Sequence, residues 1–466
     1  MRVKSSGLEQ DDEEKAHADV SMCILNENRR RNIVVGCCHR RVGGTRSLTH
    51  SLPHSLTLFH SFISTFFCTK TSIRLVYQLS GKPSSTKGAG NVGGIFITDV
   101  TNACRWLFMD LAKVQWDQSL VDTICKPHSV PVSALPEIKS SSEVYATASA
   151  SCGIDSFDNV PVCAILGDQQ AALFGQGAFQ TGEAKNTYGT GMFLMMNTGS
   201  KMVPSTHGLL TTIAFQIGKQ NVVYALEGSV SHSGSTIQWL RDRLRIIDEA
   251  PDSETVAAST TSNDGLYFVP AFAGLFAPHW RADARGCIVG MTATHHKGHV
   301  CRAALEAAAY QTRDIFEAIY NDSGVRLKQL KVDGGASANK LLMQFQADMI
   351  SADVVRPVVM ETTSMGAAFA AGLAVGVWKS TDEIRAMWAE DKRFKPSMDE
   401  KQREKYWKGW KKAISKSKGW IGNDSDDSKK SLPKSHASPP MGMLPLAVTA
   451  VAAAFAVGVL VGKKQR

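Results

Sequence analysis

The sequence predicts an α/β fold, and three observations support this class. Short apolar runs that are readable as strands alternate with segments of helical apolar spacing between residues 160 and 375. Glycine-rich turns stand at several of the junctions between them. The composition, with 43% hydrophobic and 20% charged residues, suits a globular protein, and a length of 466 residues suggests two or three domains.

The first clear strand is the apolar run over residues 160–166, which ends at Gly167 and reads as buried. A helix is expected to begin directly after it, over residues 168–174. Residues 184–197 are predicted to form two strands around the turn at residues 188–191. A carboxylate and a glycine-rich turn therefore follow predicted strands within one short part of the chain.

The second half of the chain continues the alternation. Helices are predicted over residues 299–320, 337–350 and 364–375, and strands over residues 327–332 and 354–359. The helix over residues 364–375 is rich in small residues, so another helix can pack closely against it. The alternation of strands and helices indicates an α/β architecture in this region.

The two ends of the chain differ from its middle. Residues 1–72 show no coherent period and are predicted to be irregular. We expect no signal peptide in them, because acidic residues stand where an early apolar run would be needed. After a last helix over residues 401–416, residues 417–442 read as a flexible linker with three prolines.

The uncharged run over residues 443–462 predicts a transmembrane tail anchor. A helix rises about 1.5 Å per residue, so this run is just long enough to cross about 30 Å of hydrocarbon. Basic residues close it at the C-terminus. The alternative is a buried C-terminal helix of the preceding domain, which would not explain the polar linker.

The charge and the cysteines narrow the function classes. The net charge is +9, but Lys and Arg crowd residues 29–46, 401–418 and 428–434 instead of lining a groove with aromatics. This distribution argues against nucleic acid as a partner and favours an anionic membrane surface. None of the ten cysteines forms a CxxC pair or a metal-ligand spacing with His, which suggests reduced, structural thiols in the cytosol.

Three turns are candidates for carrying chemistry. Asp168 stands between a buried strand and a helix, where it is either a helix N-cap or a general base facing a cleft. The turn over residues 187–191 has two glycines that let the backbone approach an anion, and it is otherwise a plain hairpin. The turn over residues 333–339 opens a helix, whose N-terminus favours negative charge, and it is otherwise an ordinary strand–helix connection. Each turn alone favours the plainer interpretation.

The order of these turns, and the long strings around them, resembles glycerol kinase of the FGGY carbohydrate kinase family over residues 75–416. The strings that carry the resemblance are TDVTNACRWLFMDL from Thr98, SSEVY from Ser141, GDQQAALFGQGAFQTGEAKNTYGTGMFLMMNTG from Gly167, ALEGSVSHSGSTIQWLRD from Ala225, YFVPAFAGLFAPHWRADARGCIVGMT from Tyr267, RAALEAAAYQTRD from Arg302, VDGGASANKLLMQFQAD from Val332 and ETTSMGAAFAAGLAVGVW from Glu361.

The resemblance implies an actin-like, ribonuclease-H-like fold whose two domains close on ATP and Mg²⁺. Residues 73–166 would be a remnant of the first kinase domain, and residues 167–416 the second. It also implies that glycerol is phosphorylated to glycerol 3-phosphate at the expense of ATP. The implied site residues are Asp168 as catalytic base, substrate contact and metal ligand; Gln169 and Phe193 as glycerol contacts; Thr190 and Gly191 as the second phosphate loop; Gly234 and Gln238 as nucleotide contacts; and Gly335 and Asn339 as contacts to adenosine.

The sequence departs from the family at its start. The family's first phosphate hairpin, Asp-x-Gly-Thr-Thr-Ser, and its Gln-Arg-Glu and Trp-Gln-Asp glycerol segments have no counterpart here. We therefore expect that the first domain is largely missing, through truncation or mis-assembly, and that the polypeptide as written is nearly inactive. The alternatives are a catalytically inactive member, a gene-model fragment, or a kinase of another polyol or sugar. The tail anchor implies a kinase domain facing the cytosol, on the mitochondrial outer membrane. Homo-oligomerisation stays open.

Overall fold

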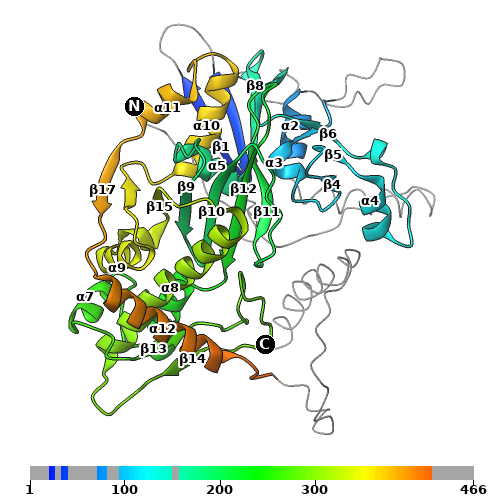
Figure 1. Cartoon of the computed structure of the whole chain (residues 1–466). Helices are drawn as coiled ribbons and strands as arrows, with labels where there is room; N and C mark the ends of the chain where they lie inside the picture. Colours follow the sequence, from blue (N-terminus) through cyan, green and yellow to red (C-terminus); the bar gives the residue numbers. More distant parts are fainter. Residues whose placement is uncertain (1–19, 27–32, 40–70, 81–93, 149–156, 422–466) are drawn as a thin grey trace, which may run out of the picture. The chain divides into compact units, whose positions relative to one another are not determined.

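The structure is a computed structural model that describes residues 20–26, 33–39, 71–80, 94–148 and 157–421 (Figure 1). The chain divides into two compact units, Met1–Ile421 and Gly422–Arg466, and all of the described residues belong to the first. The predicted tail anchor over residues 443–462 and most of the predicted linker lie outside them. Within the described ranges, no helix combines the length and apolarity needed to cross a bilayer.

A four-stranded sheet with the order β1-β2-β8-β7 forms the first part of the fold. Its strands are β1 (Val20–Asn26), β2 (Ile33–His39), β7 (Ser142–Thr147) and β8 (Pro161–Gly167). Strand β2 runs parallel to β8, whereas β1 is antiparallel to β2 and β7 is antiparallel to β8. Within residues 1–72, the segments of β1 and β2 are therefore regular strands, where an irregular segment was predicted. Two seven-residue strands are too short for a periodic pattern, and their partner β8 lies more than 120 residues further along the chain.

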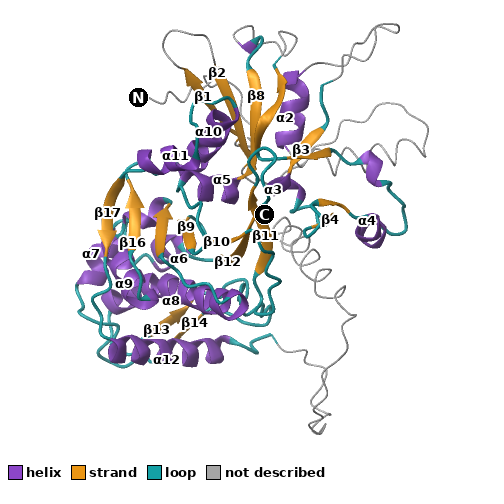
Figure 2. Cartoon of the chain, turned by 45° about the horizontal axis from the view of Figure 1, so that its top comes forward, coloured by secondary structure: helices purple, strands orange, loops and turns teal. Residues whose placement is uncertain are grey.

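Short elements lie to one side of strand β8 (Figure 2). They are α2 (Thr71–Ser80), β3 (Ile97–Asp99), α3 (Val100–Ala103), β4 (Met109–Asp110), β5 (Gln115–Trp116), α4 (Gln118–Cys125), the 3-10 turn η1 (Val132–Ala134) and β6 (Glu137–Lys139). Strands β3 and β6 pair in parallel, which places the start of α3 beside the end of β8.

A seven-stranded sheet with the order β11-β12-β10-β9-β15-β16-β17 forms the second part of the fold. Its strands are β9 (Glu183–Tyr188), β10 (Met192–Gly199), β11 (Leu210–Phe215), β12 (Val223–Val230), β15 (Gln329–Asp333), β16 (Val354–Pro357) and β17 (Glu390–Phe394). The pairs β9–β15 and β15–β16 are parallel, and the other pairs are antiparallel. The sheet is therefore mixed, as the α/β class allows.

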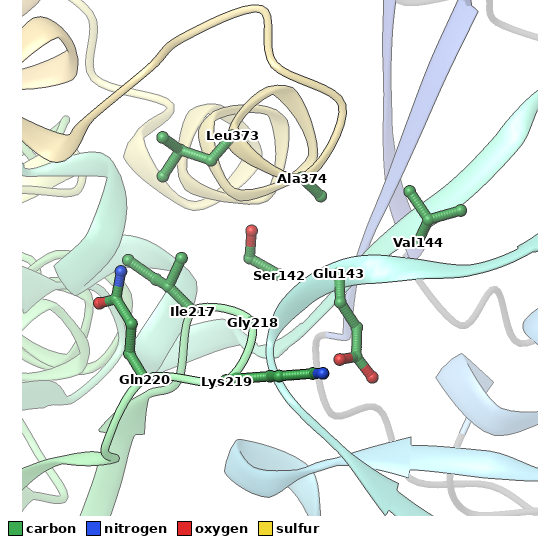
Figure 3. A pocket seen from close by; sticks show the side chains of 9 residues that line it. All are labelled: Ser142, Glu143, Val144, Ile217, Gly218, Lys219, Gln220, Leu373 and Ala374. Atoms are coloured by element: carbon green, nitrogen blue, oxygen red, sulfur yellow. The ribbon is translucent and has the colours of Figure 1, made fainter.

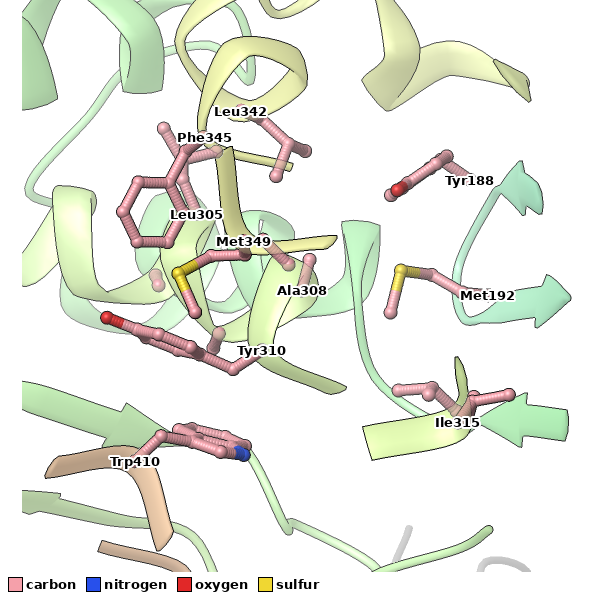
Figure 4. Close-up of a cluster of buried hydrophobic side chains, with 14 of the residues drawn as sticks. Tyr188, Met192, Leu305, Ala308, Tyr310, Ile315, Leu342, Phe345, Met349 and Trp410 are labelled. Atoms are coloured by element: carbon pink, nitrogen blue, oxygen red, sulfur yellow. The ribbon is translucent and has the colours of Figure 1, made fainter. Parts of the chain in front are cut away.

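Helices cover both faces of the seven-stranded sheet. Helices α8 (Lys297–Ser323) and α9 (Lys340–Ile350) pack on one face, and α5 (Asp168–Gly175) and α10 (Thr362–Ala374) pack on the other. On the α8 side, Tyr310 stacks on Trp410 at 5.1 Å between ring centroids and meets Phe345 edge-on (Figure 4). The sheet thus lies between two apolar clusters, which keeps its central strands buried.

The remaining elements complete the second part. They are α6 (Gly234–Trp239), the π-turn η4 (Leu240–Leu244), α7 (Asp252–Ala258), β13 (Tyr267–Val269), β14 (Cys287–Val289), the 3-10 turn η5 (Gly335–Ala338), α11 (Thr381–Met387) and α12 (Glu400–Ser417). The antiparallel pair β13–β14 lies between α8 and α12 (Figure 2).

Helices α5 and α10 cross with their backbones in contact at two glycines. A Cβ atom on Gly366 would lie 1.8 Å from the carbonyl oxygen of Ala171, and one on Gly175 would lie 1.9 Å from that of Thr362. This confirms the expectation that the small-residue helix packs closely against another helix. The crossing fixes α5, and with it Asp168, against the sheet.

Most of the predicted elements are present with boundaries that differ by a few residues. The clearest difference concerns the helix expected over residues 337–350, where a 3-10 turn ends at Ala338 and α9 begins only at Lys340. Asn339 separates them because its side chain accepts a hydrogen bond from the amide of Leu342 as the N-cap of α9.

Candidate active site

Asp168 is the first residue of α5, at the end of the buried strand β8. The capping position is Gly167, which has extended backbone (φ −65°, ψ 152°) and offers no side chain, so the interpretation of Asp168 as an N-cap is wrong. The carboxylate is half-buried and accepts a hydrogen bond from the amide of Gln169 at 2.8 Å. It therefore keeps acceptor capacity at a helix N-terminus, where negative charge is favoured.

Strand β9 turns one row of side chains toward α5, and that row is polar. Ala184 and Tyr188 belong to the cluster on the α8 side, so Lys185 and Thr187 project to the opposite face, where the side chains of α5 lie. The Lys185 ammonium donates to Oε1 of Gln169 and, at 3.0 Å, to Oγ1 of Thr187. These bonds join the start of α5 to the centre of the seven-stranded sheet.

Lys185 is fully buried among charged groups from several elements. Burial lowers the pKa of Lys185, while Asp333, Asp168 and Glu227 act in the opposite direction by attraction. Arg105, in the turn after α3, pairs with Glu227 of β12 and adds a second cation to this cluster. Cations and carboxylates thus lie near one another in this cluster, and their attraction offsets part of the desolvation free energy of burying them.

Asp333, at the end of β15, is held by two donors. The side-chain amide of Gln176 donates to its Oδ2 at 2.8 Å, and the hydroxyl of Thr362 donates to the same oxygen at 2.6 Å. In the parallel register Asp333 lies opposite Thr187, which is the residue that Lys185 contacts. The third turn therefore begins directly beside the polar row of β9.

The turn between β9 and β10 is bound to the segment that precedes α6. Ser233 and Ser235 each donate a backbone hydrogen bond to the carbonyl of Thr190 at 3.0 Å, and Gly234 donates to Gly189 at 3.0 Å. Gly191 is needed here, since a Cβ atom would lie 2.3 Å from the carbonyl oxygen of Val230. The predicted phosphate loop and the predicted nucleotide segment are therefore one packed unit.

The third turn also reaches the β9–β10 turn. Gly334 has a left-handed backbone (φ 85°), and a Cβ atom there would lie 2.4 Å from the carbonyl oxygen of Tyr188. The next residue, Gly335, is exposed, and a Cβ atom on it would meet nothing within 4 Å. The structure thus brings the three predicted turns together and leaves the backbone of Gly335 open to a ligand.

The remaining predicted site residues lie around this junction. Phe193 is 39% exposed on β10, directly opposite Thr187, so an aromatic face borders the polar row. Thr190 and Gln238 are exposed, on the β9–β10 turn and on α6. Asn339 uses its Oδ1 to cap α9, which leaves its amide donors for another partner.

Several charged and polar residues of this region were missed from the sequence: Lys185, Glu227, Arg105 and the capping pair Asp99 and Thr101. Asp99 caps α3, and the hydroxyl of Thr101 accepts a hydrogen bond at 2.8 Å from the amide of Gly167, beside Asp168. A charged residue inside an apolar strand, as in AKNTY, is the one signal that could have identified Lys185.

His232 and the described thiols have ordinary surroundings. His232 is half-buried with its Nδ1 2.7 Å from the hydroxyl of Ser231 and its ring edge-on to Phe272, so its side chain has both polar and apolar neighbours. The five cysteines whose side chains are described are free. Within the described residues, no group of three or more His, Cys, Asp or Glu side chains could hold a metal by itself.

A surface pocket of about 580 Å³ has a lining of nine other residues (Figure 3). It is lined by β7, by the turn between β11 and β12, and by the end of α10, with Glu143 and Lys219 as its charged side chains. None of the predicted site residues lines it. The candidate active site therefore rests on the three converging turns and not on this hollow.

The two sheets and their covering helices place the chain in the α/β class of proteins, and comparisons with known proteins identify its family. The N-terminal domain of the FGGY family of carbohydrate kinases matches residues 90–175, and its C-terminal domain matches residues 184–375. The crystal structure of Plasmodium falciparum glycerol kinase with ADP is 37% identical, with a TM-score of 0.70, and the match covers 77% of this chain and 69% of that one. The chain belongs to the FGGY family of carbohydrate kinases.

Two curated relatives are glycerol kinases. A glycerol kinase of Clavibacter michiganensis subsp. michiganensis is 56% identical over 335 residues, and one of Renibacterium salmoninarum is 57% identical over 332 residues. The matches cover 72% and 71% of this chain, and the chain spans 65% and 64% of the length of these relatives. Part of the family's N-terminal domain is present in residues 90–175, and the expectation that most of it is missing stays a prediction.

Proposed function

We propose that this chain transfers the γ-phosphoryl group of ATP to a terminal hydroxyl of glycerol. The observation that carries the proposal is the convergence of Asp168, the β9–β10 turn and the turn after β15 on one junction. Identity of 56–57% to glycerol kinases supports glycerol over another polyol.

The chemistry follows from the groups at the junction. Asp168 has a half-buried carboxylate that can accept the proton of a hydroxyl as that oxygen attacks phosphorus. Phe193 offers an apolar wall for the carbon chain, and Gln169 offers amide hydrogens to a second hydroxyl. The exposed backbone at Thr190 and Gly335 can approach the phosphates and the adenosine. Positioning and charge stabilisation supply most of the rate in such reactions.

Mg²⁺ fits the donor set as a nucleotide-bound ion. A magnesium ion is commonly held by one or two carboxylates together with substrate phosphates and water. Asp168 keeps acceptor capacity because, of its two oxygens, one accepts the Gln169 amide at 2.8 Å and the other has a contact of 3.4 Å to the Gln169 side chain. When bound, the ion would neutralise charge on the transferred group, and Asp168 is the residue that would hold it.

The test is glycerol-dependent ADP release by the full chain, measured with a coupled assay. Asp168→Asn should lower kcat by about 10²–10⁴-fold, since the general base is lost while the shape of the site is kept. Asp382→Asn, on an exposed residue in the first turn of α11, is the matched control and should retain wild-type rates. Equal rates in wild type and Asp168→Asn would refute the assigned role.

A second candidate is a family member that binds nucleotide without turning it over. The observation that favours it is the exposure of Phe193 and Thr190, because an efficient kinase site excludes water from the reacting groups. This candidate predicts ADP binding by calorimetry together with no glycerol-dependent release above the Asp168→Asn background. Robust turnover would exclude it and would contradict the expectation of a nearly inactive polypeptide.

A membrane tether is a separate proposal that rests on composition. Residues 444–462 carry no charged side chain and are followed by Lys463 and Lys464. We expect the full chain to sediment with vesicles that contain anionic lipid, and a chain that ends at residue 442 to stay in solution. Imaging both chains in cells would test the proposed mitochondrial outer membrane. Equal sedimentation of the two chains would refute the tether.

A further inference from the structure

The side chain of Lys185 has a position that packing does not explain. It is fully buried at the centre of the seven-stranded sheet, next to Met195 on β10 and Lys331 on β15. Burying an ammonium group costs roughly several kcal/mol unless its N–H donors have acceptors and its charge has a partner. A methionine of similar length would fill the same space without that cost. The ammonium group therefore has a role of its own at this position.

The ammonium determines which way the side chain of Gln169 faces. Lys has only donors, so the Gln169 atom that it contacts must be the carbonyl oxygen Oε1. The NH₂ group then lies on the other side of the carboxamide, with Nε2 3.4 Å from Oδ2 of Asp168. A rotation of the amide by 180° would bring its oxygen toward the carboxylate and its NH₂ toward the ammonium, and both contacts would be repulsive.

We propose that Lys185 is a positioning residue that orients Gln169, so that an amide donor stands beside the acceptor Asp168. This donor–acceptor pair suits two neighbouring hydroxyls, one that accepts from Gln169 and one that gives its proton to Asp168. The bond from Lys185 to Thr187, at 3.0 Å, holds the ammonium in place from its own strand. The inference deepens the proposed function, on which it rests, by naming how the site selects a vicinal diol.

The test is a double-mutant cycle on Lys185 and Gln169, read as kcat/KM for glycerol in the full chain. Lys185→Met and Gln169→Ala should each lower kcat/KM by about 10–100-fold, since small misplacements near reacting groups cost up to about 10²-fold. Most of the change should be in KM for glycerol, with KM for ATP within about threefold. If Lys185 acts through Gln169, the double variant should be no worse than the poorer single variant.

Further variants separate positioning from folding. Lys185→Arg keeps the charge but changes the geometry, so it should show a partial loss that also disappears in the Gln169→Ala background. The cycle is read with this variant if Lys185→Met does not fold, as judged by circular dichroism and Tm. If the wild-type chain binds glycerol without turnover, calorimetric affinities replace kcat/KM in the same cycle.

The outcomes distinguish this inference from the proposed function. Non-additive losses in a chain active on glycerol support both. Additive losses in an active chain overturn the role of Lys185 and leave the kinase proposal standing. A wild-type chain that neither binds nor phosphorylates glycerol overturns the kinase proposal, and the inference with it.

Discussion

Replacing Gly366 by alanine is expected to destabilise the protein, although helix propensity predicts the opposite. The new Cβ atom would lie 1.8 Å from the carbonyl oxygen of Ala171 and 2.8 Å from the amide nitrogen of Gly175. Real Cβ atoms essentially never come closer than 3.0 Å, so α10 would have to move by about 1.2 Å from α5. The obstructing atoms belong to the backbone of α5, so no side chain can rotate to make room.

The magnitude follows from two opposing terms. Overpacking in a well-packed region costs about 1–3 kcal/mol, and a clash with backbone belongs at the upper end of that range. Alanine gains about 1 kcal/mol over glycine inside a helix. The net loss in the free energy of unfolding is therefore about 2 kcal/mol, which lowers Tm by roughly 2 °C in a protein of this size.

The assay is thermal unfolding followed by circular dichroism, with two companion variants. Gly175→Ala tests the same crossing from the other helix, where the clash is 1.9 Å, and should lose a similar amount. Gly335→Ala is the matched control for stability alone, since its Cβ would meet nothing within 4 Å, and its Tm should stay near that of wild type. A Tm for Gly366→Ala at or above the wild-type value would refute the described crossing of α5 and α10.

Three further predictions concern charge and close approach. Burial raises the pKa of Glu306 from 4.5 to about 7, so the folded state holds the proton more tightly than the unfolded state does. The free energy of unfolding should therefore fall as pH rises from about 4.5 to about 7. Glu306→Gln should flatten the slope of Tm against pH, and an unchanged slope would contradict the assignment. Arg105→Met should lower the free energy of unfolding, measured with denaturant, by about 3 kcal/mol, because Glu227 is left buried and unpaired. Adding Glu227→Met to the same chain should restore part of this loss, and a further loss in the double variant would argue against the pair. Gly191→Ala should weaken ADP binding at least tenfold by calorimetry, since its Cβ would be forced to 2.3 Å from the carbonyl of Val230, and unchanged affinity would show that this turn is not part of the nucleotide site.

The elements that could be predicted from the sequence are those with strong local signals. Apolar runs mark the strand that ends at Gly167 and the strand after the β9–β10 turn, and helical apolar spacing marks α8. Such patterns can be read from residues that are close together in the sequence. The grouping of the three turns came from the family resemblance, because each turn alone favoured a plainer interpretation. The structure gives a physical reason for that grouping in the backbone contacts of Gly234 and Gly334.

What could not be predicted depends on partners that are distant in the chain. Strand β2 pairs with β8, and Arg105 pairs with Glu227, 122 residues away. No local pattern records such a partner. Lys185 was overlooked because a lysine in a strand is usually taken as exposed, whereas here the side chain turns toward the start of α5 and is fully buried.

The packing of the β9–β10 turn restricts how this part of the molecule can evolve. A Cβ atom on Gly191, Gly234 or Gly334 would lie only 2.3–2.5 Å from a backbone oxygen of a neighbouring segment. A side chain at any of these positions would require the opposing segment to move. That segment is itself packed against a neighbouring backbone in the same unit. Variation around this turn is therefore easier at residues whose side chains point away from the packed backbones, such as the exposed Phe193.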